Sequence, residues 1–160
     1  MKEAWKEKIL TFQQNEITEN RIYRRLARRI KSQDNREVLE KIAAEELRHY
    51  EIWKKYTGTD VSPRKGKVWF YCLISRLFGF TFGVKLMERG EEGAQENYEQ
   101  LRDKVEEAEA IIRDENRHEN ELLRMLDEER LKYTGSIVLG LNDALVELTG
   151  ALAGLTLALQ

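Results

Sequence analysis

Cysteine, proline and histidine are scarce in this sequence of 160 residues, which contains one cysteine, one proline and two histidines. The single cysteine, Cys72, excludes an internal disulfide, and no Cys-x-x-Cys pair is available for a zinc ribbon or a rubredoxin-type iron centre. Such sparing use of cysteine is typical of a reducing compartment. With 35% charged residues, the composition favours long solvated helices with an apolar stripe over a sheet protein.

The sequence also lacks a strong net charge and an N-terminal targeting segment. The formal net charge is −2, which gives no indication that nucleic acid is a partner. The opening residues, MKEAWKEKILTFQQNE, are charged and amphipathic, so we expect no cleavable signal peptide.

Lysine and arginine are absent after Lys132, and residues 133–160 are almost wholly apolar. About 20 residues suffice to cross a bilayer, so this tail predicts a transmembrane helix, with a buried C-terminal helix or an oligomer contact as the alternative. Arg130 and Lys132 at its start place the preceding domain on the cytoplasmic side of the membrane. The polar residues of the tail are Asn142, Asp143 and Glu147. Because one membrane helix with two carboxylates rarely works alone, we expect residues 135–160 to be the truncated start of a membrane transporter domain.

Apolar residues recur at spacings of three, four and seven in the first 134 residues, which is typical of amphipathic helices. The predicted helices cover residues 3–31, 36–56, 68–102 and 104–132. Residues 32–35 offer good N-cap side chains, and residues 57–67, with the only proline, form the linker between two helical hairpins. Residues 1–134 are therefore expected to form one all-α domain, a four-helix bundle.

Residues 68–87 are apolar on most sides but are interrupted by Arg76, Gly79 and Gly83. A membrane segment, a segment at the membrane surface and a helix buried between subunits are all compatible with this pattern. The arginine and the two glycines argue against a simple span. The contact between subunits is favoured, so we expect a homodimer.

Both histidines occur in the same local pattern. Glu46 lies three residues before His49, and Glu115 lies three residues before His118. Residues at i and i+3 share a helix face, about 5–6 Å apart at Cβ, so each pair can bind one metal ion. Each pair also follows a glutamate and a tyrosine that are seven residues apart, and these are Glu16 with Tyr23 and Glu91 with Tyr98.

Distances along the helices place the four carboxylates at matching heights. Glu16 and Glu46 lie about 16 and 13 residues from the first turn, and Glu91 and Glu115 about 12 from the second, at a rise of about 1.5 Å per residue. Burying four carboxylates without cations is unfavourable, and carboxylates with imidazoles suit iron or manganese better than a thiolate-seeking metal. The sequence therefore predicts a two-metal centre. The alternative is a bundle whose histidines form only ion pairs.

Several neighbouring residues have less certain roles. Glu88, one turn before Glu91, is a candidate seventh ligand or exchanges with Glu91, and Glu19 stands in a similar relation to Glu16. For both residues, a solvated position or a supporting position behind the ligands is the favoured interpretation. Tyr23 and Tyr98 either orient the metal-binding carboxylates or are ordinary core tyrosines. The glutamates assigned to an exposed, charged face are Glu45, Glu92, Glu96, Glu119 and Glu121.

These segments resemble the rubrerythrin-like branch of the ferritin-like superfamily. The matching stretches are Glu16 with Tyr23, EELRH at 45–49, ERGEEGAQENY at 88–98 and DENRH at 114–118. The tail SIVLGLNDALVELTGALAGLTLAL, 136–159, is similar to the first transmembrane helix of the vacuolar iron transporter family. Fusions of such a domain to such a transporter are known, and the resemblance covers essentially the whole chain.

The resemblance implies a ferritin-like four-helix bundle that holds two iron ions, with manganese as the other candidate. The implied ligands are Glu16, Glu46, His49, Glu88, Glu91, Glu115 and His118. Such a domain binds Fe(II) or Mn(II), and it either oxidises the ion with O2 or H2O2 or delivers it to the membrane domain. In the membrane domain, the resemblance places Asn142, Asp143 and Glu147 on the ion route. Without a rubredoxin domain, a rubrerythrin-type peroxidase needs an external reductant. A non-catalytic metal-sensing or loading module is the remaining alternative.

Overall fold

The computed structural model describes residues 2–89 and 105–159, and within them it contains helices and no strand. The helices are α1 (Lys2–Ala27), α2 (Gln33–Thr57), α3 (Lys65–Phe78), α4 (Phe80–Arg89) and α6 (Ala108–Ala158). The chain divides into two compact units, Met1–Leu122 and Leu123–Gln160. The prediction of an all-α protein is confirmed for the part of the chain described.

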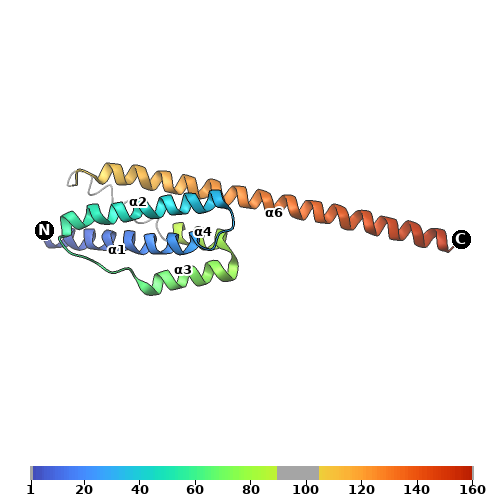
Figure 1. Cartoon of the computed structure of the whole chain (residues 1–160), viewed down its shortest axis with the longest axis horizontal. Helices are drawn as coiled ribbons and strands as arrows, with labels where there is room; N and C mark the ends of the chain where they lie inside the picture. The colour runs from blue at the N-terminus through green and yellow to red at the C-terminus, as the bar shows by residue number, and fades with distance from the viewer. Residues whose placement is uncertain (1, 90–104, 160) are drawn as a thin grey trace. The chain divides into compact units, whose positions relative to one another are not determined.

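Helices α1 and α2 form an antiparallel hairpin (Figure 1). Helix α1 ends at Ala27 rather than at residue 31, because the chain tightens into a turn in which the amide of Ile30 donates to the carbonyl of Ala27. Ser32 is the N-cap of α2 and accepts a hydrogen bond from the backbone N–H of Asn35. Gly58 closes α2 with a left-handed φ of 67°, a conformation that glycine adopts without steric cost.

Part of the apolar core lies between this hairpin and the start of α6. Phe12 and Trp53 pack with ring centroids 5.7 Å apart, and their neighbours Val105, Ala108 and Ile111 are also buried. Burying a large apolar side chain contributes about 1.5–3 kcal/mol, so this cluster fixes α1 and α2 against residues 105–111. The expected fourth helix begins at Ala108 rather than at residue 104, after a turn in which the amide of Ala108 donates to the carbonyl of Val105.

The segment between α2 and α3 is held along α1 by hydrogen bonds. The side-chain amide of Gln13 donates to the carbonyl of Thr59 at 2.8 Å, and the backbone N–H of Arg64 donates to Oγ1 of Thr18 at 3.0 Å. The linker predicted from the single proline is therefore pinned to α1. As a result, α3 starts beside α1.

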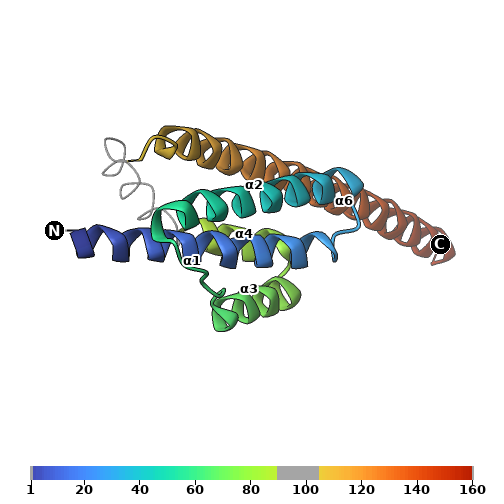
Figure 2. The same cartoon turned by 60° about the vertical axis from the view of Figure 1, so that its left-hand side comes forward.

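The prediction of one helix over residues 68–102 is wrong. Helix α3 ends at Phe78, and Gly79 adopts a φ of 91°, which other residues rarely adopt. Helix α4 then packs back against α3, as Figure 2 shows. At their contact, a Cβ on Gly83 would lie 1.9 Å from Oγ of Ser75, so only glycine allows this approach. Val84 and Met87 of α4 are fully buried.

The second unit consists of the later part of α6. Its segment Tyr133–Ala158 has a mean hydropathy of 1.4 and is long and apolar enough to cross a membrane. All side chains from residue 133 to residue 159 are exposed. Asn142, Asp143 and Glu147 belong to this segment.

Candidate metal centre

Three helices of the first unit bring four potential metal ligands together. Glu16 lies on α1, Glu46 and His49 on α2, and Glu115 on α6. Each offers one ligand atom, and these atoms all lie within 4.8 Å of one another. Glu16, Glu46 and His49 are almost completely buried. Such a concentration of carboxylates away from water is unfavourable unless cations or protons balance it.

The Nδ1 atom of His49 lies at the centre of this group. It is 3.3 Å from Oε1 of Glu115, 3.6 Å from Oε2 of Glu16 and 3.7 Å from Oε2 of Glu46. None of these contacts satisfies Nδ1 with hydrogen-bond geometry. Two atoms that each bind one ion at about 2.1 Å lie about 3.0–3.4 Å apart at octahedral or tetrahedral angles. The observed separations are therefore close to those of atoms that share an ion.

Glu46 faces both histidines with different oxygen atoms. Its Oε2 lies near Nδ1 of His49, and its Oε1 lies 3.1 Å from Nδ1 of His118. The two imidazole rings have centroids 5.9 Å apart. His118 is buried, and its Nδ1 also lacks a partner with hydrogen-bond geometry. Glu46 is thus near both histidines, each through a different oxygen atom.

The other nitrogen of each histidine faces a carboxylate from the opposite helix. Nε2 of His49 lies 3.2 Å from Oδ2 of Asp114, and Nε2 of His118 lies 2.6 Å from Oε2 of Glu45. A carboxylate in this position accepts the Nε2–H bond, which leaves the lone pair of Nδ1 directed toward the cluster. Both ring orientations are therefore those of metal-binding histidines.

Sequence analysis missed these two carboxylates, and the assignment of Glu45 to an exposed, charged face is wrong. Each of these carboxylate residues directly precedes the glutamate of a Glu-x-x-His pair. The two stretches are EELRH at 45–49 and DENRH at 114–118. This repeated acid–glutamate pair was a usable signal. The pairing itself could not be read from one helix, because each carboxylate contacts the histidine of the other.

Arginine and tryptophan side chains hold the carboxylates in place. Arg117 pairs with Glu45 at 2.9 Å and with Asp114 at 2.8 Å, and Arg48 also pairs with Asp114. On the opposite side of the site, Nε1–H of Trp53 donates to Oε1 of Glu16 at 2.9 Å. Charge-assisted bonds of this kind fix carboxylate orientation more firmly than neutral ones.

Burial and mutual contacts shift the pKa values of the ionisable groups of the centre in different directions. Burial and the nearby charge of Glu115 raise the pKa of Glu46 well above its usual range, and burial also raises the pKa of Glu115. Burial opposes the charging of His49, yet its contacts with Glu115, Glu16 and Glu46 raise its pKa. For Glu16, the contacts with His49 and Glu46 outweigh burial and lower the pKa.

The remaining candidate residues have varied positions. Glu88 belongs to the last turn of α4, and Glu91 and Tyr98 lie outside the described residues. Tyr23 is buried, and Glu19 is buried with Oε1 at 3.7 Å from Nζ of Lys67. The assignments of these residues as ligands or supporting groups stay predictions.

A scan against protein-family models gave no match, and searches of curated proteins and of solved structures gave none either. The resemblance to rubrerythrin-like domains and to vacuolar iron transporters therefore stays an expectation from sequence motifs.

Proposed function

We propose that the first unit is a ferritin-like four-helix bundle that binds two Fe(II) ions, with Mn(II) as the other candidate metal. The observation that carries this proposal is the orientation of the two histidines. Each directs Nδ1 toward buried glutamates while a carboxylate of the opposite helix holds Nε2. A pair of imidazoles that formed only structural ion pairs would not require this arrangement twice.

The donor set fits iron or manganese. Glu16, Glu115 and His49 would hold one ion, and His118 would hold the second, with Glu46 between them. Mixed carboxylate and imidazole ligands suit these metals better than thiolate-seeking ones. The remaining ligands of the second ion are assigned to Glu88 and Glu91, as the sequence motif implies.

The protein side chains would do three things in this function. Glu46 neutralises charge and orients two ions at once, because its two oxygens face different histidines. Trp53, through its bond to Glu16, keeps that carboxylate directed at the site. The buried walls limit access of water. A bound iron pair supplies one-electron redox chemistry that amino-acid side chains lack.

We further propose that the chain oxidises Fe(II) or delivers it to an attached transporter from the cytoplasmic side of a membrane. The support is the apolar segment Tyr133–Ala158, whose length suits a bilayer span, and its polar residues Asn142, Asp143 and Glu147. O2 or H2O2 would be the oxidant.

The deciding experiment is an anaerobic Fe(II) titration of the full chain in detergent, with metal content measured after gel filtration. We expect two ions per chain, and loss of paired binding in Glu46→Ala and in Glu115→Ala. Glu119→Gln is the matched control, because Glu119 is an exposed carboxylate directly beside His118 in sequence. Wild-type stoichiometry in the Glu46 and Glu115 variants would overturn the proposed centre.

A second measurement separates oxidation from delivery. The anaerobically loaded chain is mixed with air or with peroxide, and the ferric absorption is recorded over time. Rapid oxidation of both ions indicates an oxidoreductase. Ions that stay ferrous and are removed by a chelator indicate a loading or sensing module.

A further inference from the structure

Positive charge is concentrated in two segments of the first unit. Residues 20–33 contain six lysines and arginines and no carboxylate, and residues 61–87 contain five and no carboxylate. These segments adjoin in space, because α3 packs against α1 and Nη1 of Arg29 donates to the carbonyl of Cys72 at 3.4 Å. Arg25, Arg28 and Arg29 lie beside Arg76 of α3, so a chain with a net charge of −2 has a local concentration of positive charge there.

Large apolar side chains are exposed on the same hairpin of α3 and α4. Trp69 is 63% exposed, Leu77 65% and Phe78 64%, and Phe70 and Phe82 are about half exposed. Single exposed apolar residues are ordinary, but five on two short adjacent helices form a patch of the kind that marks an interaction surface. We call these five residues, together with the adjoining Arg25, Arg28, Arg29 and Arg76, the α1/α3/α4 face.

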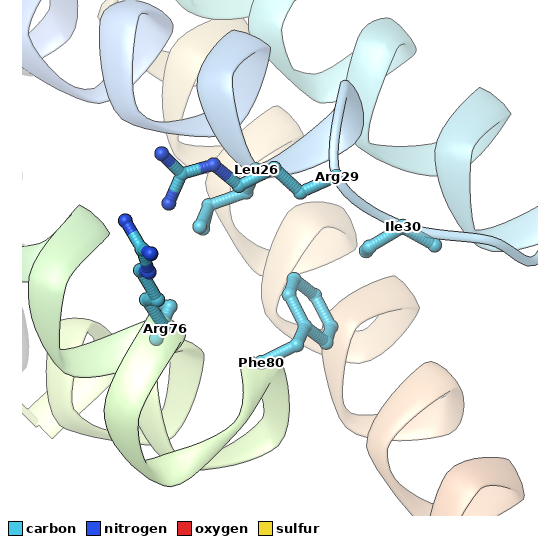
Figure 3. A pocket seen from close by; sticks show the side chains of 6 residues that line it. Leu26, Arg29, Ile30, Arg76 and Phe80 are labelled. Carbon is cyan, nitrogen blue, oxygen red and sulfur yellow. The ribbon is translucent and has the colours of Figure 1, made fainter.

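Two arginines from different segments meet at a cavity in this face. Arg29, in the turn after α1, and Arg76 of α3 extend into the same space, with Leu26, Ile30 and Phe80 around it, as Figure 3 shows. The cavity has a volume of about 420 Å³, and Ser75, which also lines it, has a buried hydroxyl with no hydrogen-bond partner among the described residues.

A second cavity of about 350 Å³ adjoins the first and shares both arginines. Arg25, Arg28 and Trp69 complete its rim. Within the described residues, none of these four arginines forms an ion pair. Guanidinium groups recognise phosphate through paired N–H donors, and indole rings favour the region between water and hydrocarbon. The two cavities thus combine groups suited to a lipid phosphate with groups suited to the acyl-chain boundary.

Other anionic or apolar partners fit this face less well. A second copy related by twofold symmetry would bring two faces of the same positive charge together, which is unfavourable. A nucleic acid would balance the charge but leave Leu77, Phe78 and Phe82 in water. A bilayer with anionic headgroups satisfies both components, and the chain already carries a segment suited to a bilayer.

We propose that the α1/α3/α4 face docks on an anionic phospholipid surface, with a lipid phosphate between Arg29 and Arg76. The basic side chains bind the headgroups while Trp69 and Phe78 enter the boundary of the hydrocarbon. The proposal depends on membrane association of the chain but not on metal binding at the candidate centre. Sequence analysis left a membrane-surface role for residues 68–87 open, and the charge and exposure of this face favour it over the contact between subunits.

The three tryptophans make a direct test possible, because all lie in the first unit and only Trp69 is strongly exposed. The full chain is placed in nanodiscs of phosphatidylcholine with or without phosphatidylglycerol, using acyl chains brominated near the headgroup. Bromine quenches tryptophan only at close range. The Trp69→Phe variant identifies the part of the emission that belongs to Trp69.

We expect Trp69 to be quenched in anionic discs and to recover in high salt, since exposed charge interactions are screened. Arg29→Gln with Arg76→Gln should reduce the ratio of docked to undocked chain about thirtyfold, at about 1 kcal/mol per basic residue. The matched control, Lys6→Gln with Lys55→Gln, removes the same charge from exposed positions outside this face and should change the ratio little.

Three results would overturn the proposal. The first is equal quenching in anionic and neutral discs, or no quenching in either. The second is an equal effect of the arginine pair and the lysine pair. The third is shielding of Trp69 that increases with protein concentration in neutral discs, which would assign the face to a second copy of the chain. Because no metal is added, these results are independent of the titration that tests the metal centre.

Discussion

Nε2 of His49 lies 3.2 Å from Oδ2 of Asp114, although the two residues are 65 positions apart. Glu45 and His118 form the reciprocal contact across 73 positions at 2.6 Å. Each Glu-x-x-His helix thus supplies the carboxylate that orients the histidine of the other helix.

Removing either orienting carboxylate should weaken metal binding without removing a ligand. Asp114→Asn should lower the affinity of the ion at His49 about 10–100-fold, and Glu45→Gln should do the same for the ion at His118. Mn(II) titration followed by electron paramagnetic resonance measures both ions. Glu119→Gln should bind like the wild type. Unchanged affinity in both carboxylate variants would show that the reciprocal contacts do not support the ligands.

The metal-free chain should lose stability as pH rises from about 5 to 9. Glu46 and His49 have folded-state pKa values raised above those of the unfolded chain, so the folded form holds these protons more tightly. Their contribution is present at pH values below the unfolded pKa and is lost as pH rises through the folded pKa. We expect the free energy of unfolding to fall by at least about 1 kcal/mol, the equivalent of one pKa unit. Urea unfolding with a chelator present measures it.

Glu46→Gln provides the matched test of that pH dependence. Its neutral amide resembles a protonated carboxyl group, so the metal-free variant should lose less stability than the wild type as pH rises, with the part due to His49 remaining, while paired metal binding is lost. By the same reasoning, Mn(II) binding to the wild type should release about one to two protons per chain and become tighter with rising pH. Calorimetry in two buffers with different ionisation enthalpies measures the released protons. Binding without proton release would contradict the assigned protonation.

Trp53→Phe should destabilise the chain by about 1–2 kcal/mol, because it leaves Oε1 of buried Glu16 without its indole N–H donor. The aromatic packing against Phe12 is largely kept, so the loss reports mainly on the hydrogen bond. Trp69→Phe is the control, since Trp69 is 63% exposed and should change the free energy of unfolding by less than about 0.5 kcal/mol. Equal effects of the two substitutions in urea unfolding would refute the role of the bond.

Gly83→Ala should destabilise the α3–α4 hairpin by about 1–3 kcal/mol, because the new methyl group would meet Ser75 at the helix contact. Combining it with Ser75→Gly should recover part of the loss in thermal unfolding. Gly66→Ala is the control, since a Cβ there meets nothing within 4 Å, and it should be neutral or stabilising. A neutral Gly83→Ala would show that the two helices are not in close contact.

The sequence predicted the parts of this molecule that depend on a single helix. The period of apolar residues located α1 and α2 to within a few residues, and the i, i+3 spacing pointed to Glu46, His49 and Glu115, which the structure brings together with Glu16. It failed at Gly79, where the apolar period continues through a residue whose positive φ ends the helix. Periodicity reports which side chains share a face and does not report a reversal of the chain.

Contacts between helices were the other gap. Glu45 was assigned to a solvated face, but the opposite helix brings His118 and Arg117 against it. No spacing within either helix contains that information. The repetition of an acid before each Glu-x-x-His pair was the signal that could have pointed to it.

The reciprocal contacts between α2 and α6 also have a consequence for folding. An ion that joins Glu46 and His49 to Glu115 acts as a reversible cross-link, because it closes a loop of nearly 70 residues between two distant helices. Closing a loop of this length removes chain entropy mainly from the unfolded state. The supply of metal would then determine how many centres are occupied and also how often the whole first unit unfolds. Amide hydrogen exchange, with and without metal, measures this opening residue by residue.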